Sequence, residues 1–74
     1  MPELPRISGS EAIKVFCRIG FSVVRQHGSH VVLRRRDKGC VVPLHKELAV
    51  GTLRSAIRQS GITADDFVAE WQSR

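Results

Sequence analysis

The sequence predicts an α+β fold in which one helix, three antiparallel strands and two more helices follow in order, with the helices on one face of the sheet. Apolar residues recur at helical spacing before residue 20 and after residue 50. Between them, short β-branched runs are separated by two turn sequences, Gly28-Ser29 and Asp37-Lys38-Gly39. These patterns predict the order α-β-β-β-α-α.

The first helix is expected over residues 9–19. Ser8 and Glu11 have the spacing of a capping box, in which the glutamate reaches back to the amide of the serine. Gly20 is expected to end the helix, because glycine readily adopts the left-handed conformation that follows the last helical residue. The apolar face is predicted to consist of Ala12, Ile13, Phe16, Cys17 and Ile19.

A hairpin of residues 21–27 and 30–36 follows, and residues 40–43 form a short third strand. Pro43 has no amide hydrogen to give to a ladder, so the third strand is expected to end there or to lie at an edge. Residues 44–50 are predicted to be a loop.

The second helix is expected over residues 51–60, with Leu53, Ala56 and Ile57 facing inward and Gly61 ending it. Thr63 has the character of a further N-cap, because Asp65 and Asp66 would then lie in the first turn and complement the helix dipole. The last helix is predicted to bury Phe67, Val68 and Trp71.

The 74 residues suffice for one small domain, residues 1–74, whose core leaves no room for a deep cavity. Any functional site is therefore expected on an exposed face. A net charge of +5 favours polyanionic partners, either nucleic acid or an acidic protein surface. We find no secretory signal and no stretch of transmembrane length, which predicts a cytoplasmic protein with no membrane partner.

Cys17 and Cys40 lack metal-ligand spacing, and no cluster of histidines or aspartates surrounds them. Two buried, reduced thiols are the favoured interpretation, while a disulfide stays open until their geometry is known. No cofactor or metal is expected.

A two-residue turn at Gly28-Ser29 would pair His27 with His30, Arg25 with Val32 and Val23 with Arg34. Ser22, Val24, Gln26, Val31, Leu33 and Arg35 would then share one face, with Val24, Val31 and Leu33 toward the helices. The other face would carry Phe21, Val23, Arg25, His27, His30, Val32, Arg34 and Arg36. Its apolar members would form a second small core, the favoured interpretation, or stack against bases.

Histidine titrates near neutral pH and arginine binds phosphate, so His30 beside Arg25 and Arg34 suggests an RNA-cleaving site. Metal-free cleavage needs a base for the 2′-hydroxyl, an acid for the leaving 5′-oxygen and cations for the phosphorane. His30 could serve as base or acid. The alternative is a polar hairpin tip with a solvated basic edge.

Other candidate sites in the sequence are weaker. No grouping of Asp, Glu and His suggests a two-metal nuclease. Ser29 and His30 are adjacent and would point to opposite faces of a strand, so they are poorly placed for a catalytic dyad of serine nucleophile and histidine base. His45 follows Pro43 in a loop, where a structural or solvated role is favoured.

Several segments together resemble the HicA toxin family of bacterial toxin-antitoxin pairs. They are Phe21, Arg25-Gln26-His27-Gly28-Ser29-His30, Val31-Val32-Leu33-Arg34, Val42-Pro43-Leu44-His45 and Gly51-Thr52-Leu53-Arg54-Ser55. The resemblance runs over about residues 8–62. Its most specific part is the Gly-Ser-His segment followed at a distance by Gly-Thr-Leu-Arg.

The resemblance implies a double-stranded-RNA-binding-like fold and the toxin of a type II pair, a metal-independent endoribonuclease that cleaves messenger RNA. It maps the active-site histidine onto His30 and implies a HicB-type antitoxin that covers the site. Together with the basic face, it leads us to expect RNA contacts from Gly28, Ser29, Arg25, Arg34, Arg36 and Arg54, and no direct contact with DNA.

Two alternatives to the toxin stay open: a non-catalytic RNA-binding module that uses the basic sheet face, and an interaction protein that only docks an acidic partner. Arg54 could contact phosphate or antitoxin, or be solvated. Residues 63–74 lie beyond the resemblance, and they either extend the core or touch the partner.

Overall fold

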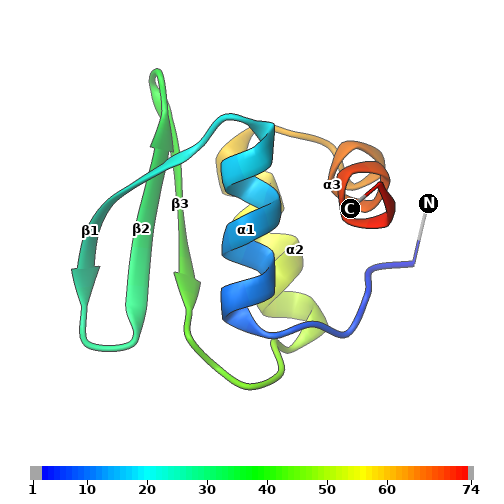
Figure 1. Ribbon diagram of the computed structural model, residues 1–74, viewed down its shortest axis with the longest axis horizontal. Coiled ribbons are helices and arrows are strands. Elements are labelled where there is room, and N and C mark those ends of the chain that lie inside the picture. The colour runs from blue at the N-terminus through cyan, green and yellow to red at the C-terminus, as the bar shows by residue number, and fades with distance from the viewer. Residues whose placement is uncertain (1–2, 74) are drawn as a thin grey trace.

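The computed structural model describes residues 3–73. The elements are α1 (Gly9–Ile19), β1 (Ser22–His27), β2 (His30–Arg35), β3 (Lys38–Pro43), α2 (Val50–Ser60) and α3 (Ala64–Gln72). The three strands form one antiparallel sheet in the order β1-β2-β3, and α1 and α2 lie on one face of that sheet (Figure 1). α3 packs on the two helices, away from the sheet. This arrangement confirms the predicted fold class.

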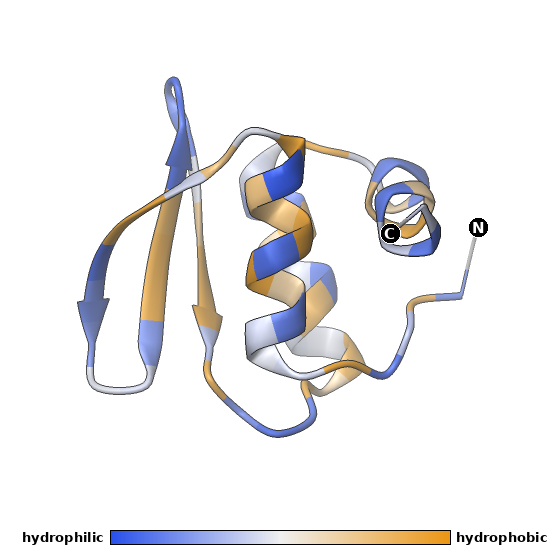
Figure 2. Cartoon of the chain, in the orientation of Figure 1, coloured by the Kyte–Doolittle hydropathy of each residue, from blue (hydrophilic) through white to orange (hydrophobic). Residues whose placement is uncertain are grey.

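The core lies between the sheet and the two covering helices, where apolar residues of β2 and β3 face those of α1 and α2 (Figure 2). Alternate residues of the two strands are buried, as expected for a sheet with one covered face. The strands and α2 contribute Val31, Leu33, Cys40, Val42, Leu53, Ala56 and Ile57. Leu4 and Ile7, which precede α1, are buried as well, although no periodic pattern in the sequence indicates this.

The α1 helix begins and ends as predicted. Ser8 Oγ accepts a hydrogen bond from the Glu11 amide at 3.1 Å, and Glu11 Oε1 accepts one from the Ser8 amide at 2.9 Å, which completes the capping box. Gly20 follows with a φ of 123°, a conformation that L side chains rarely adopt. The cap of α3 is also confirmed, because Thr63 Oγ1 accepts from the Asp66 amide at 3.0 Å.

The prediction that both thiols are buried is wrong for Cys17. The inward stripe of α1 consists of Ala12, Val15 and Phe16, and Cys17 lies one step further around the helix on the exposed side. Both cysteines are free, which excludes a disulfide between them. Cys40 is buried in the core, and desolvation raises the pKa of its thiol to about 11.

A β-bulge in β1 changes the predicted faces of the sheet. The register runs as expected from the His27–His30 pair to the Arg25–Val32 pair, but the next pair is Val23 with Leu33, which leaves Val24 as the extra residue. Val23 therefore does not pair with Arg34. The predicted inward position of Val24 is also wrong, because Val23 and Val24 are 49% and 54% exposed on the strand farthest from the helices.

Phe21 lies in the core and not on the basic face where the simple alternation put it. Its ring contacts that of Phe16 edge-on, with centroids 5.5 Å apart, and the guanidinium of Arg35 lies 5.0 Å from its centroid. Arg35 also donates a hydrogen bond to the carbonyl of Ile19 at 3.2 Å. The bulge makes this placement compatible with an outward-facing Arg25, because it reverses the alternation once within β1.

The turn between β2 and β3 consists of Arg36 and Asp37, one step earlier than the predicted turn at Asp37-Lys38-Gly39. The buried Leu33–Cys40 and Val31–Val42 pairs fix the register of these strands, so only two residues remain to close the turn. Arg36 consequently adopts a φ of 58°, which is uncommon for a residue other than glycine.

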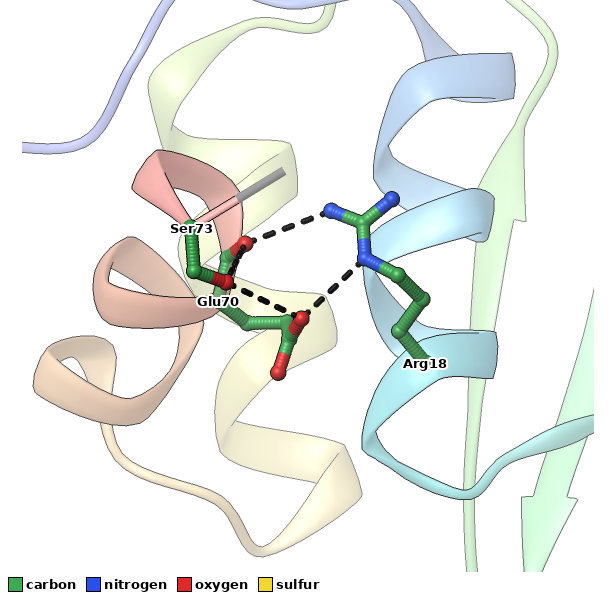
Figure 3. A network of polar contacts seen from close by, with 3 residues as sticks. All are labelled: Arg18, Glu70 and Ser73. Carbon is green, nitrogen blue, oxygen red and sulfur yellow. Dashed lines mark hydrogen bonds and ion pairs between the residues drawn. The ribbon is translucent and has the colours of Figure 1, made fainter.

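α3 is attached to α1 by an aromatic contact and a polar network. The Phe67 ring is fully buried, with its centroid 5.2 Å from that of Phe16. Arg18 donates from Nε to Glu70 Oε2 at 3.1 Å and from Nη2 to the Glu70 carbonyl at 3.2 Å, and Ser73 Oγ joins the same carboxylate (Figure 3). Of the described residues after 62, Phe67 thus extends the core, while Val68 and Trp71, which were predicted to be buried, are only partly so.

Over residues 3–73, no helix is long and apolar enough to cross a membrane.

Replacement of Gly9 by alanine should destabilise the fold, because the new Cβ would collide with the carbonyl oxygen of Pro43. We expect a loss of about 1–3 kcal/mol in the free energy of unfolding, typical of overpacking. Gly51→Ala is the matched control: nothing lies within 4 Å of its added Cβ, so it should be neutral or stabilise the protein by about 0.5 kcal/mol. Urea unfolding of both variants measures this difference, and equal effects would contradict the close contact.

Phe67→Ala should cost about 3–5 kcal/mol of unfolding free energy, because it leaves a cavity beside Phe16. Glu70→Ala should cost less than about 1 kcal/mol, because the ion pair that it removes is about one-third exposed. Urea unfolding of the two variants compares these contributions. A larger loss from Glu70→Ala would mean that polar contacts and not aromatic packing attach α3.

A candidate nucleic-acid site at the hairpin end of the sheet

The turn between β1 and β2 is tight and requires its glycine. Gly28 has a φ of 56°, as expected for the first central residue of a two-residue hairpin turn. Gln26 Nε2 donates a hydrogen bond to the Gly28 carbonyl at 3.0 Å, which adds a side-chain contact to the turn. The turn places His27 directly opposite His30 at the end of the sheet.

The face of the sheet opposite the helices carries the basic residues of the hairpin. Val31 and Leu33 point into the core, so the alternate residues of β2, among them His30 and Arg34, point away from it. Arg25 and His27 join this face because they pair with Val32 and His30. We call the four exposed side chains Arg25, His27, His30 and Arg34 the basic face.

Two members of the basic face are in contact. Nη1 of Arg25 lies 3.4 Å from Nε2 of His27, and both side chains are exposed. Val32 lies half-buried between His30 and Arg34, and Val41, its partner on β3, is exposed on the same side. The face therefore offers cations and imidazoles around a small apolar centre.

Backbone hydrogen bonds hold the hairpin turn to the rest of the molecule. The amide of Leu44 donates to the carbonyl of Ser29 at 2.6 Å, and the amide of Gly9 donates to the carbonyl of His45 at 2.9 Å. A third bond joins the Leu48 amide to the carbonyl of Ile7 at 2.8 Å. The turn, the loop after β3 and the start of α1 thus form one connected end of the molecule, which periodicity in the sequence does not reveal.

The structure does not bring all of the predicted RNA contacts together. Arg36 lies in the β2–β3 turn, at the opposite end of the sheet from His30 (Figure 1). Arg36 is six residue steps along the chain from His30, which is about 20 Å of extended strand. Arg54 lies on α2 and lines a surface hollow with Arg6 and Val50, on the side of the helices. The compact part of the predicted site is therefore Gly28, Ser29 and the basic face.

The basic face combines groups that accept and donate protons with groups that bind phosphate. The side chains are exposed, so substrate can approach without any opening of the fold. Within residues 3–73, no three His, Cys, Asp or Glu side chains are grouped as a metal would require. The sequence prediction left His27 without a role, although its pairing with His30 follows from the turn length.

An open, basic sheet face backed by helices defines an α+β domain with a double-stranded-RNA-binding-like fold. The family profile described as the HicA toxin of bacterial toxin-antitoxin systems matches residues 9–62, and the chain belongs to this family. A search of curated proteins found no match. Family membership supports a toxin role, an antitoxin partner and nuclease activity in general. α3 lies outside the matched residues.

Gly28→Ala should destabilise the hairpin although nothing lies within 4 Å of the added Cβ, because an L residue is strained at this φ. We expect a loss of about 1 kcal/mol in unfolding free energy. D-alanine at the same position, introduced by chemical synthesis, favours positive φ and should restore the stability or raise it. Urea unfolding compares the three proteins, and equal stability of both alanine forms would contradict a conformational cause.

Proposed function

We propose that this chain is the toxin of a type II toxin-antitoxin pair, a metal-independent endoribonuclease that cleaves messenger RNA with His30 as a general acid or base. The whole chain, residues 1–74, serves as the toxin domain. One observation carries the proposal: in a chain of the HicA family, His30 lies on the same open face as Arg25 and Arg34. This activity requires the protein to act in the cytoplasm, where bacterial messenger RNA is found.

The reaction needs no group beyond the RNA and the protein. A base removes the proton of the 2′-hydroxyl, and the 2′-oxygen forms a bond to the adjacent phosphorus. The bond from phosphorus to the 5′-oxygen breaks, and an acid gives that oxygen a proton. The products are a 2′,3′-cyclic phosphate and a free 5′-hydroxyl. His30 supplies one of the two proton transfers.

The arginines of the basic face have a separate task in this proposal. Arg25 and Arg34 bind the scissile phosphate or its neighbour and stabilise the charge that develops on the phosphorane. Gly28 and Ser29 let the backbone of the turn approach the RNA closely. Arg36 and Arg54 lie too far from His30 to act on the same phosphate, so they contact more distant parts of a long RNA.

The same charge distribution supports an acidic antitoxin of the HicB type as the protein partner. The chain carries a net charge of +5, and β1 is exposed along its whole length. A partner that covers the basic face would neutralise its arginines and exclude RNA from His30 at once. We therefore propose that the antitoxin and the substrate compete for one surface.

His30→Gln should lower RNA cleavage by about 10²- to 10⁴-fold, because a general acid–base group is removed while the fold remains. The experiment incubates a structured RNA with each protein in excess EDTA and identifies 2′,3′-cyclic phosphate ends. Circular dichroism shows that the variant is folded. His45→Gln is the matched control, an exposed histidine outside the basic face, and it should cleave like the parent.

The remaining outcomes decide between this function and its alternatives. Equal cleavage by the parent and His30→Gln would mean that another residue or a contaminant is responsible. If neither cleaves but both bind RNA with a steep salt dependence, the protein is an RNA-binding module. Without RNA affinity at physiological salt, the basic face serves only a protein partner.

A further inference from the structure

The two histidines of the hairpin lie directly opposite each other on the basic face. His27 ends β1, His30 begins β2, and they are paired across the ladder. Side chains of directly paired residues point to the same side, and their Cβ atoms lie about 5 Å apart. The two-residue turn fixes this pairing, since no loop residue remains to absorb a shift.

The side chain of Arg25 approaches one imidazole of this pair. Nη1 of Arg25 lies 3.4 Å from Nε2 of His27, and both side chains are exposed. Because an arginine side chain has donors only, this contact is a hydrogen bond when Nε2 of His27 carries its lone pair. A neutral imidazole with an available lone pair is the form that a general base requires.

We infer that His27 is a second catalytic residue, the general base that complements His30 as general acid. This inference rests on the proposed ribonuclease function and deepens it, because metal-free RNA cleavage needs two proton transfers and one side chain cannot make both at the same moment. The chain has three histidines, and only His27 and His30 share the basic face.

Each step of the reaction then has a group on the hairpin. A phosphate oxygen of the bound RNA takes over the hydrogen bond from Arg25, which frees the lone pair on Nε2 of His27. His27 removes the 2′-hydroxyl proton as the 2′-oxygen bonds to phosphorus. His30, protonated, gives its proton to the 5′-oxygen as the bond between phosphorus and that oxygen breaks. Transfer of one proton from His27 through water back to His30 restores the starting state.

The surroundings of the pair contain few other groups that titrate. On the basic face, the neighbouring charges are the guanidinium groups of Arg25 and Arg34. Pro43 and Val41 are the nearest residues that β3 contributes to this side, and neither titrates. His45 and Lys46 lie in the exposed loop after β3, which makes His45 the competing candidate for a second proton-transfer group.

The first experiment is the pH dependence of single-turnover cleavage of a short RNA in EDTA. The parent should give a bell-shaped profile, because the base fails when protonated and the acid fails when deprotonated. His27→Gln should lower the maximal rate about 10²-fold or more and abolish the fall in rate at low pH. His30→Gln should instead abolish the fall at high pH. His45→Gln is the control and should keep both limbs.

A second substrate separates the two roles. Uridine 3′-(4-nitrophenyl phosphate) has a leaving group that needs no protonation, so it bypasses the general acid. His30→Gln should recover to within about 10-fold of the parent on this ester, while His27→Gln should stay at least 10²-fold slower. A residue that only supports the fold would not give opposite results with the two substrates.

Other results overturn the inference while leaving the proposed function in place. If His27→Gln keeps the rate and both limbs of the profile, or if His45→Gln loses the limb at low pH, His27 is not the base. Recovery of both histidine variants on the activated ester would likewise exclude it. If the parent itself fails to cleave either substrate, the proposed ribonuclease function fails, and the inference fails with it.

Discussion

The single extra residue in β1 is the constraint on which the arrangement of the molecule depends. Without it, strict alternation would put Phe21 on the same side as Arg25, and either the aromatic ring would be exposed or the cation would be buried. The bulge at Val24 reverses the alternation once. Phe21 then packs on Phe16 under Arg35, while Arg25 and His27 face solvent.

A chain of 74 residues has few apolar side chains with which to form a core. They are buried between the sheet and the helices. α1 and α2 cover the sheet, and α3 adds Phe67 to the aromatic group around Phe16. Because the core is completed on this side, the other face of the sheet is not needed for packing. Its basic residues are therefore free to contact other molecules.

The proposed chemistry suits an exposed face on a small protein. Burial would strengthen electrostatic effects but would also require a cavity that the core cannot hold. Here the backbone supplies the order instead. The two-residue turn, its bond to Leu44 and the cross-strand pairing fix which backbone positions of Arg25, His27 and His30 lie next to one another. The proposed competition between antitoxin and substrate fits an open site, since a covering protein would keep substrate away from it.

The sequence by itself determined the elements and their order, because periodicity, caps and turn residues act over a few neighbouring positions. It determined the capping box at Ser8, the turn at Gly28-Ser29 and the pairing of His27 with His30, all of which are local. It also located most of the basic face. The roles of these side chains in catalysis stay predictions.

Only the tertiary structure decided the faces of Phe21, Val23 and Val24 at the start of β1. The bulge, the left-handed Arg36 and the exposure of Cys17 depend on how buried pairs such as Leu33–Cys40 fit together, and no local pattern encodes that fit. The separation of Arg54 from the basic face has the same origin, whereas that of Arg36 follows from the length of β2. Distances between elements are set by packing across the core, where residues far apart in the chain must fill one volume.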